Sequence, residues 1–472
     1  MKRRDFIIQS GLLSTGSILL PNYLLSKPKG HENNRPAIHN RTFRSKSVED
    51  LIQTIKPAIK DPELAWMFEN CYPNTLDTTV DYEMINNRPD TFIITGDIDA
   101  MWLRDSTAQV WPYMPLIKKD EKLKNMVLGL VNRQTQCVLL DPYANAFYKD
   151  KNRESHWKSD RTQMLPGVHE RKWEIDSLCY VIRLAHEYHH QTAETKLFDT
   201  DWDKAMRLIV KTFKAEQRKD GDSPYRFARK TETMTDSPLF NGTGRPAKAN
   251  GLICSMFRPS DDATNLPYLI PSNIFAVLSL RQLAGIYQNS LNDTQFSKEC
   301  SDLADEIDSA IKQFATAHHL DFGEIYAYEI DGFGNRIFMD DANVPSLMSL
   351  AYLGAHKPDD GIYQRTRAFL LSDSNPYFLK GSAAQGQGSP HTWKVHIWPM
   401  GIILRALTST DENEIRQCIE WLKSTHAGTG FMHEAFHKDN PDQYTRSWFA
   451  WANTLFGELI IKVYHEFPTL LE

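Results

Sequence analysis

Six short polar and aromatic blocks recur along the chain, and each leads into an apolar stretch with helical spacing. The blocks combine carboxylates with Trp, Arg, His and Asn, and five of them contain a serine just before the helical stretch. Serine is a favoured N-cap, because its hydroxyl accepts a hydrogen bond from an unpaired amide of the first turn. Helices that stand side by side would therefore gather these blocks around one polar, aromatic-walled pocket. The blocks lie at 96–106, 173–177, 258–273, 340–346, 396–399 and 433–448.

The helical stretches alternate between two kinds. Residues 274–280 are apolar on nearly every side, whereas 301–308 carry a clearly charged face. A helix that is apolar on most sides is buried on most sides, so the alternation predicts an inner and an outer layer. Six inner and six outer helices make an all-α (α/α)6 barrel, which we expect to be one catalytic domain over residues 47–472. Apolar periodicity predicts helices over 178–188, 202–213, 272–288, 295–314, 346–353, 400–408, 413–424 and 447–465.

One segment departs from the helical pattern. In residues 323–340 the side chains of Ile325, Ala327 and Glu329 alternate before the turn-forming sequence Asp-Gly-Phe-Gly-Asn. Period-two alternation followed by glycines is typical of a strand and a turn. We expect a small β-hairpin inserted in the barrel.

The first residues resemble an export signal rather than part of a fold. Arg3 and Arg4 precede a short apolar stretch over residues 7–20, as in signals of the twin-arginine kind. That stretch is shorter than the ~20 apolar residues that span a bilayer, so no stable membrane insertion is expected. Residues 1–30 are predicted to hold the signal and the start of a flexible lead-in, which continues over 31–46. This pattern favours an exported, periplasmic protein.

Composition excludes several classes of function. The net charge of −6 provides no basic surface for nucleic acid, so no nucleic-acid partner is expected. The six cysteines are scattered without the spacing of a metal finger, and neither a metal site nor a cofactor is predicted. Cys179 lies on a periodic helical stretch, which favours a buried thiol there. The pairing of the cysteines is not determined by the sequence.

The carboxylates of the blocks suggest cleavage of a glycosidic bond. Such a reaction needs one carboxylic acid to protonate the leaving oxygen and a second carboxylate to activate water or attack the sugar. The pair Asp261-Asp262 lies among apolar residues, which favours a retained proton, and Glu434 follows a flexible glycine-containing loop. A helix cap and a surface charge are the plain structural alternatives. The Asp97-Ile-Asp99 sequence also matches a metal–nucleotide motif of glycosyltransferases, but no nucleotide-binding fold accompanies it.

Residues 95–113, Thr-Gly-Asp-Ile-Asp-Ala-Met-Trp-Leu-Arg-Asp-Ser-Thr-Ala-Gln-Val-Trp-Pro-Tyr, resemble the signature of glycoside hydrolase family 125, the exo-α-1,6-mannosidases. The sequences at 257–263, 270–273 and 432–436 resemble its other motifs in the same order. The resemblance runs from about residue 47 to the C-terminus. It implies an (α/α)6 barrel that removes terminal α-1,6-linked mannose with inversion and without a metal. The expected substrates are mannose-containing oligosaccharides or N-glycans.

The resemblance also implies roles for individual residues. It places the general acid in the Arg-Pro-Ser-Asp-Asp sequence, where we assign Asp261 and keep Asp262 as the alternative, and the general base at Glu434. The residues expected to bind substrate are Asp99, Trp102, Arg104, Asp105, Asp262, Asn273, Asn343, His396, Trp398, His433 and Trp448.

Other functions on the same barrel stay open at this stage. Another inverting glycosidase or a sugar epimerase would use the same fold, since a fold does not fix a function. An epimerase could use His396 and His433 for ring chemistry, but Asp261-Asp262 would then have no role. A non-catalytic exported glycan-binding protein could use the same aromatic pocket without two opposed carboxylates.

Overall fold

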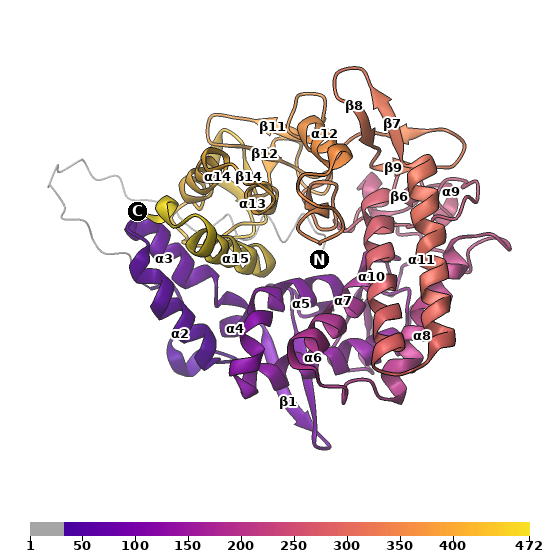
Figure 1. Ribbon diagram of the computed structural model, residues 1–472, viewed down its shortest axis with the longest axis horizontal. Coiled ribbons are helices and arrows are strands. Elements are labelled where there is room, and N and C mark those ends of the chain that lie inside the picture. The colour runs from indigo at the N-terminus through magenta and orange to yellow at the C-terminus, as the bar shows by residue number, and fades with distance from the viewer. Residues whose placement is uncertain (1–32) are drawn as a thin grey trace, which may run out of the picture.

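The computed structural model describes residues 33–472, so the predicted export signal lies outside the described residues (Figure 1). The described chain is mostly helical, with a few small strands. Its α-helices are α2 (Lys46–Ile55), α3 (Pro62–Cys71), α4 (Asn74–Thr78), α5 (Leu103–Val110), α6 (Glu121–Leu140), α7 (Ile175–Thr192), α8 (Thr200–Glu216), α9 (Leu239–Gly242), α10 (Ile270–Asn289), α11 (Thr294–Phe314), α12 (Gly361–Leu370), α13 (Pro399–Leu407), α14 (Glu412–Ser424) and α15 (Ala450–Glu466). Two 3-10 helices matter for the packing, η3 (Trp111–Lys119) and η5 (Met348–Leu350).

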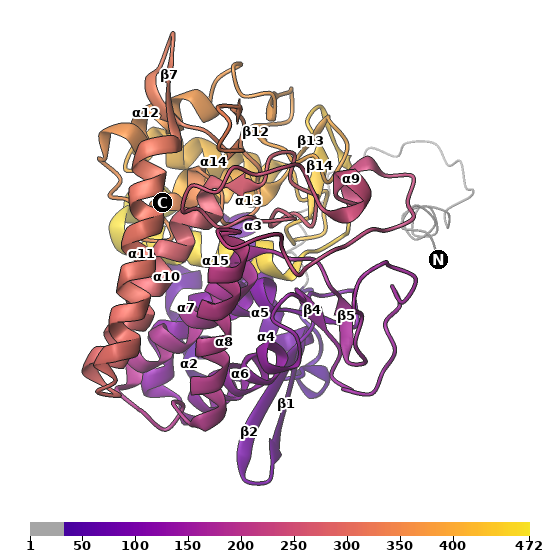
Figure 2. The ribbon, with the colours of Figure 1, turned by 90° about the vertical axis from the view of Figure 1, so that its right-hand side faces the viewer.

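The strands are short and pair in antiparallel fashion in small sheets. Each sheet connects loops at the ends of helices instead of forming a layer of its own. The sheets are β1 (Val80–Ile85) with β2 (Arg88–Ile93); β3 (Met101–Trp102), β4 (Ala146–Phe147) and β5 (Val168–Glu170); β6 (Tyr268–Leu269), β9 (Glu329–Ile330) and β10 (Arg336–Ile337); β7 (Thr316–His319) with β8 (Gly323–Tyr326); β11 (Phe378–Lys380) with β12 (Gln385–Gln387); and β13 (His396–Ile397), β14 (Ala435–His437) and β15 (Asn440–Thr445). Figure 2 shows β4, β5, β13 and β14 on the same side of the molecule.

Six helical segments contact one another in a closed sequence around the centre of the molecule. Helix α5 contacts α7, α7 contacts α10, and α10 contacts η5. The sequence continues from η5 to α13 and from α13 to α15, which returns to α5. Outside them, α6 packs on α5 and α7, α8 on α7, α11 on α10, α12 on η5, α14 on α13 and α3 on α15. Helices from near the two ends of the described chain, α3 and α15, therefore meet in space.

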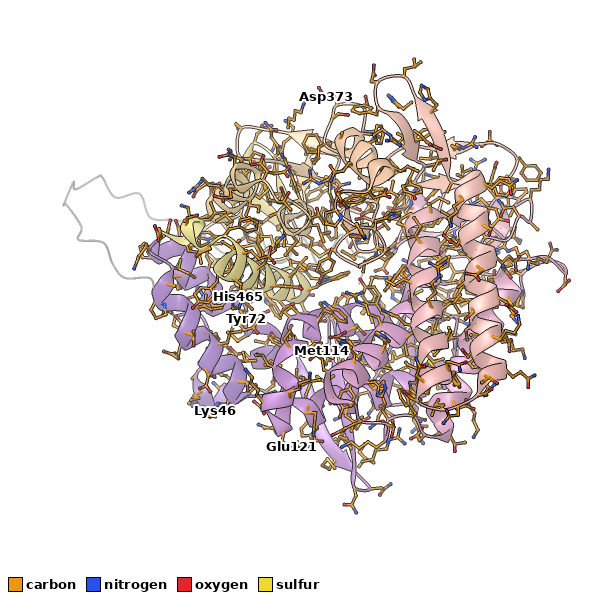
Figure 3. The ribbon with its side chains drawn as sticks, in the orientation of Figure 1. Lys46, Tyr72, Met114, Glu121, Asp373 and His465 are labelled. Carbon is orange, nitrogen blue, oxygen red and sulfur yellow. The ribbon has the colours of Figure 1, made fainter. Side chains whose placement is uncertain are left out.

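The inner and outer helices differ in burial as their sequences predict. Helix α10 is buried around most of its circumference, while α11, beside it in Figure 1, buries one face. The opposite face of α11 carries exposed ion pairs such as Lys298–Asp302. The stripe that begins at Trp202 is buried on α8, also as predicted. Figure 3 labels side chains of both kinds, Tyr72, which is buried, and Glu121, which is exposed on the outside of the molecule.

The predicted serine N-caps are wrong for three of the inner helices. Helices α5, α7 and α10 begin two or three residues before the serine, and the side chains of their N-cap residues accept no capping hydrogen bond. Helices α5 and α10 directly follow strands β3 and β6, so the helix starts where the strand pairing ends. The serine hydroxyls bind other side chains instead. Ser106 accepts from Gln134, Ser177 donates to Glu174 and Ser272 donates to Asp176.

The hairpin predicted over 323–340 has a different pairing. Strand β8 pairs backward with β7, while β9 pairs with both β10 and β6. The chain changes partner at Ala327, whose N–H donates to the carbonyl of Ala315. The side chain of Glu329 is fully buried, and its carboxylate accepts from Arg258 and from two backbone amides, which ties β9 to the loop before α10.

The segment 33–45, predicted to be flexible, is attached to the helices. The buried Arg35 guanidinium donates to Asp77 at 2.7 Å and to Glu49 at 2.5 Å. Phe43 is buried, and its backbone N–H donates to the Leu76 carbonyl. These two charge pairs and the buried ring explain why this polar stretch is ordered, which its composition did not indicate.

Two further findings concern the state of the cysteines and the apolar character of the helices. All six cysteines are free and buried, including Cys179 as predicted. Burial raises the pKa of Cys137 to about 12, and that of Cys179 is raised for the same reason. Across residues 33–472, no helix has both the length and the apolar character to cross a membrane.

Candidate active site

A cavity of about 470 Å³, with open solvent included, lies where the inner helices begin. Its walls come from the start of α5, the loop before α10, the loop before η5, the segment before α13 and the segments on both sides of the β14–β15 hairpin. Five of the six blocks therefore converge on the cavity, as the sequence predicts, whereas the block at 173–177 contributes no residue to its lining. The cavity is lined by Thr95, Ile98, Trp102, Arg104, Asp105, Pro259, Ser260, Asp261, Asn343, His391, Trp398, Glu434, Arg446, Phe449 and Trp451.

Seven of the thirteen predicted site residues line this cavity. They include both carboxylates that we assign to catalysis, Asp261 and Glu434. The other five are Trp102, Arg104, Asp105, Asn343 and Trp398.

The remaining six predicted residues lie outside the cavity lining. The Asp99 side chain is 75% exposed and pairs with Arg153 at 2.6 Å. Asn273 is fully buried, and its amide binds the backbone of Ile253 and Leu269, which leaves it no group for a ligand. It braces the chain before α10 instead.

His396 and His433 are buried behind the cavity wall. His396 packs against Trp393 with the ring centroids 4.8 Å apart, and burial lowers its pKa to about 4. His433 stacks on Tyr444 at 3.9 Å, its Nδ1 lies 3.1 Å from the Arg446 carbonyl, and burial lowers its pKa to about 4 as well. Both imidazoles are therefore neutral near pH 7.

Asp262 and Trp448 also support the wall from behind. Asp262 is buried and lies 3.4 Å from Nδ1 of His391. Burial would raise the pKa of Asp262, but the interaction with His391 lowers it below its ordinary value, so Asp262 is ionised. Trp448 covers Gly96, where an added Cβ would lie 3.2 Å from the indole ring.

The cavity includes residues that sequence reasoning did not select. Arg446 belongs to the last block and could have been selected as a charged neighbour of Glu434. His391 lies outside all six blocks, so no signal in the sequence indicated it. The other additional lining residues are Thr95, Ile98, Pro259, Ser260 and Phe449.

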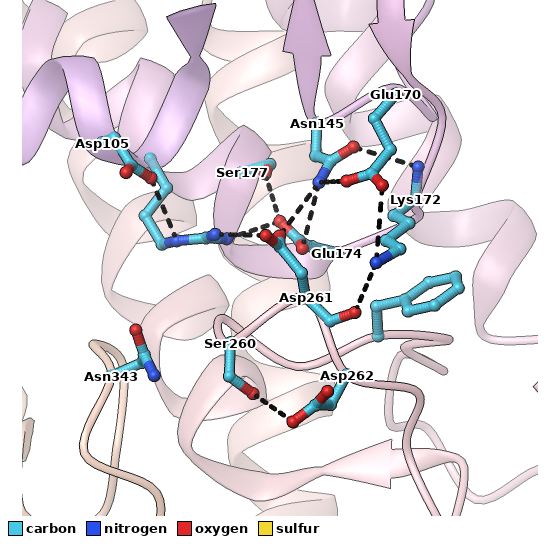
Figure 4. A network of polar contacts seen from close by, with 12 residues as sticks. Asp105, Asn145, Glu170, Lys172, Glu174, Ser177, Ser260, Asp261, Asp262 and Asn343 are labelled. Carbon is cyan, nitrogen blue, oxygen red and sulfur yellow. Dashed lines mark hydrogen bonds and ion pairs between the residues drawn. The ribbon is translucent and has the colours of Figure 1, made fainter. Parts of the chain in front are cut away.

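Asp261 is held by groups from three separate parts of the chain (Figure 4). Its Oδ1 accepts from Arg104 Nη2 at 3.3 Å and from Asn145 Nδ2 at 3.2 Å. Its backbone carbonyl accepts from Lys172 Nζ at 2.7 Å. The residue has φ 65°, a left-handed conformation that is costly for a non-glycine residue and common at functional sites. These contacts fix the direction of the Asp261 carboxyl, which is 16% exposed at the cavity.

Arg104 is shared among several carboxyl groups. It donates to Glu174 at 2.5 Å and to Asp176 at 3.2 Å, and it lies 3.6 Å from Asp105. Burial raises the pKa of Asp105 to about 6, although Arg104 acts in the opposite direction. One guanidinium thus serves four carboxyl groups, counting Asp261, which favours protonation of part of this cluster.

Glu434 has a different electrostatic environment. Its Oε1 lies 3.6 Å from Nε of Arg446, and the same nitrogen lies 3.5 Å from Asp97. Burial opposes the charge of Arg446, but attraction to Glu434, Asp97 and the nearby carboxylates outweighs it and raises the pKa of Arg446. The adjacent cation favours the ionised form of Glu434.

Aromatic rings complete the wall of the cavity. Trp102 is 6% exposed, packs edge-on against His169 and has no hydrogen-bond partner for its indole N–H within the described chain. Trp398 packs edge-on against Phe449, and its indole N–H donates to the Thr392 hydroxyl. An apolar wall of aromatic rings suits the apolar face of a sugar.

The cavity contains charged groups but no cluster suited to a metal. In the part of the chain that the structure describes, no group of three or more His, Cys, Asp and Glu side chains is arranged to hold a metal ion. The carboxylates of Asp261 and Glu434 lie beside arginine side chains instead.

Comparison with known proteins gives consistent results over nearly the whole chain. Residues 61–461 match glycoside hydrolase family 125, described as metal-independent α-mannosidases. The Meiotically up-regulated gene 157 protein of Schizosaccharomyces pombe is 41% identical over 456 residues, which cover 93% of this chain and 89% of that protein.

Solved structures show the same relationship. A Streptococcus pneumoniae protein, described as one of the metal-independent α-mannosidases and solved in a non-productive complex with α-1,6-mannobiose, superposes with a TM-score of 0.85 and 42% identity. The match covers 89% of this chain and 99% of that one. A bacterial glucoamylase complexed with acarbose has a TM-score of 0.50 and 12% identity over 87% of this chain and 57% of its own, a likeness of fold alone. On the family match and the identities to these two relatives, the chain belongs to glycoside hydrolase family 125, the metal-independent α-mannosidases.

Proposed function

We propose that this α-mannosidase is exo-acting, releases terminal α-1,6-linked mannose and inverts the anomeric configuration. The Streptococcus pneumoniae relative, which is 42% identical, was solved with α-1,6-mannobiose, and this supports the linkage. A cavity walled by several loops supports exo action, because such a cavity accepts the end of a glycan better than its middle. The substrates are mannose-containing oligosaccharides, including N-glycans.

One observation carries the proposed chemistry: Asp261 and Glu434 line the same cavity in opposite electrostatic environments. Asp261 lies in a cluster with too few cations, which favours a proton, and Glu434 lies beside Arg446, which favours a negative charge. Two carboxyl groups whose environments separate their proton affinities are suited to acid and base roles.

The reaction then follows from these two roles. Asp261 donates its proton to the glycosidic oxygen as the bond from that oxygen to C1 breaks. A water oxygen forms a new bond to C1 from the opposite face, and Glu434 accepts the proton that the water loses. A single displacement of this kind inverts the configuration at C1.

Asp261 is preferred over Asp262 because only the first lines the cavity. Asp262 is buried and kept ionised by His391, so it is poorly suited to donate a proton. We assign it to holding His391 in the wall. The sugar hydroxyls are bound by Arg104, Asp105 and Asn343, and the rings of Trp102 and Trp398 enclose the apolar part of the sugar.

The helical fold is proposed to be an (α/α)6 barrel. The closed series of contacts α5–α7–α10–η5–α13–α15 supports this assignment, since six inner segments each pack against an outer helix. The fourth inner segment is mostly irregular and contains only the short η5, which makes the barrel uneven.

We also propose export through a twin-arginine signal that includes Arg3 and Arg4. Support comes from the sequence alone, because these residues lie outside the described range. Expression of the full chain, followed by separation of periplasm from cytoplasm, tests the proposal. Substitution of Lys for both arginines is expected to hold the enzyme in the cytoplasm, and unchanged export would refute this signal.

The deciding experiment for the activity is an NMR time course of α-1,6-mannobiose hydrolysis with EDTA present. Initial release of β-mannose is expected, whereas initial release of α-mannose would exclude single displacement. Asp261→Asn and Glu434→Gln should each reduce kcat by about 10²–10⁴-fold while the substrate still binds. No hydrolysis by the unmodified enzyme would favour another linkage or a glycan-binding protein.

A further inference from the structure

Glu174 is a fully buried carboxyl group that contacts the proposed acid from behind (Figure 4). It immediately precedes α7, and its Oε2 accepts from Arg104 at 2.5 Å and from Ser177 at 2.9 Å. Its other oxygen accepts from Asn145 Nδ2 at 3.3 Å, the same nitrogen that donates to Asp261 at 3.2 Å. Glu174 and Asp261 therefore share both an arginine and an asparagine.

The two carboxyl groups also interact directly. Burial raises the pKa of Glu174 well above its ordinary value, Arg104 opposes this, and both the charge of Asp261 and a hydrogen bond with Asp261 raise it further. A hydrogen bond between two carboxyl groups requires that one of them carries a proton. The proton belongs to the pair, because such strongly coupled groups titrate together.

The surrounding charges favour retention of this proton. The groups that face the pair contribute three carboxylates and three cations, while the pair adds two more carboxyl groups to the negative side. Arg104 is divided among several of these carboxyls, and Arg446 is also engaged by Glu434. The facing groups are Arg104, Asp105, Glu170, Lys172, Asp176 and Arg446.

We propose that Glu174 is a positioning residue for the general acid: it shares one proton with Asp261 and keeps that proton on the pair until the leaving oxygen takes it. The inference rests on the proposed role of Asp261. Glu174 is too deeply buried to contact the substrate, so it acts through Asp261 alone.

The proton balance of the cycle is complete without another reactant. When the bond from C1 to the glycosidic oxygen breaks, the proton of the pair passes through Asp261 to the leaving oxygen. The pair is left as two carboxylates beside Arg104, which is the unfavourable state. Water supplies the oxygen that binds C1, and its proton passes to Glu434. Glu434 then releases this proton to solvent, and the pair takes one up.

The test is the pH dependence of kcat/KM for Glu174→Gln on α-1,6-mannobiose. The glutamine keeps the size of the side chain and can donate to Asp261, which stabilises the Asp261 carboxylate. Asp261 should then lose its proton at lower pH, and the alkaline limb should move down by about 1–3 pH units. A side chain with only a structural role would lower activity at every pH without moving the limb.

Two further measurements separate a proton effect from damage to the fold. A dinitrophenyl α-mannoside has a leaving group that needs no protonation, so Glu174→Gln should lose far less activity on it than on mannobiose. Glu170→Gln is the matched control, because Glu170 is also buried and accepts from Asn145, at 3.4 Å, but is held by Arg229 and Lys172. The alkaline limb of the Glu170→Gln profile should move clearly less than that of the Glu174→Gln profile.

The outcomes distinguish this inference from the proposed function. An alkaline limb that coincides in wild type and Glu174→Gln overturns the role of Glu174. In that case, loss of mannobiose cleavage but not dinitrophenyl mannoside cleavage in Asp261→Asn still supports Asp261 as the acid. If the Asp261→Asn variant cleaves mannobiose at the wild-type rate, both the role of Glu174 and the role of Asp261 as the acid are overturned. If the glutamine variant does not fold, Glu174→Asp serves instead, and a limb at or above the wild-type position contradicts the inference.

Discussion

Arg446 allows a strong test of how the site separates its acid from its base. Its guanidinium lies 3.6 Å from Glu434 and 3.5 Å from Asp97, and its side chain is 23% exposed. The variant Arg446→Met keeps much of the length of the side chain and removes the charge. Since Arg446 has φ 47°, and Met and Arg meet the same backbone cost there, the substitution leaves the conformational strain nearly unchanged.

The size of the effect follows from the charge separation. Two unit charges 3.6 Å apart attract by about 4–5 kcal/mol at an effective dielectric constant of about 20. Partial exposure of Arg446 lets solvent screen this attraction, so the net change corresponds to about 1–2 pKa units, or roughly 1.4–2.7 kcal/mol. Loss of the cation makes Glu434 easier to protonate. The base is then protonated up to a higher pH, and the acid limb of the profile moves upward.

The assay is the pH profile of kcat/KM on α-1,6-mannobiose, which reports the groups of the free enzyme. We expect the acid limb to rise by about 1–2 pH units, with most of the activity regained on its alkaline side. The alkaline limb should rise too, because Arg446 also attracts Asp261. Arg153→Met is the control, since Arg153 pairs with the exposed Asp99, and its profile should match wild type. An acid limb that stays in place or moves downward would refute the reasoning.

Two further predictions concern stability, measured as the free energy of unfolding in urea. Burial raises the pKa of Glu458 from about 4.5 to about 7, although a hydrogen bond from Tyr352 acts in the opposite direction. The stability that protonated Glu458 contributes is therefore complete below about pH 4.5 and is lost as pH rises through about 7. Glu458→Gln should therefore exceed wild type by up to ~3 kcal/mol at about pH 8 and equal it at about pH 4, and equal stability at both would contradict the shift. Gly430 has φ 71°, and an added Cβ would lie 2.6 Å from the Trp66 ring and 2.8 Å from the Asn70 amide. Gly430→Ala should lose about 2–4 kcal/mol from left-handed strain and overpacking, and a variant as stable as wild type would show that the loop before Glu434 yields easily.

The helices were predictable from the sequence because their burial follows a local period. The stripe from Trp202 to Phe213 lies on one buried face of α8, and the apolar run after Ile270 forms the buried α10. The boundaries of the helices and strands and the pairing of the strands were harder to predict from the sequence. Ser106 and Ser177 look like helix caps in the sequence, but strand pairing and side-chain hydrogen bonds give them other partners.

The site was predictable to the extent that its residues lie in the blocks. Trp102, Arg104 and Asp105 follow one another at the start of an inner helix, so their common place in the cavity follows from one helix position. Asn273 and His433 also lie in blocks, yet the Asn273 amide and Nδ1 of His433 contact the backbone instead of the cavity. Local sequence does not distinguish a residue that lines the cavity from one that braces its wall.

The sequence alone determined the family, the alternation of inner and outer helices and the chemical types gathered at the helix starts. Each of these depends on residues close together in the chain or on a long matching motif. Only the tertiary structure decided which of two adjacent carboxylates faces the cavity, because the left-handed backbone at Asp261 turns it toward Arg104 while Asp262 meets His391. It also decided that Glu174 touches Asp261 and that Arg446 touches Glu434. Such contacts set the proton affinities of the site, and they arise from packing between distant segments, which local periodicity does not specify.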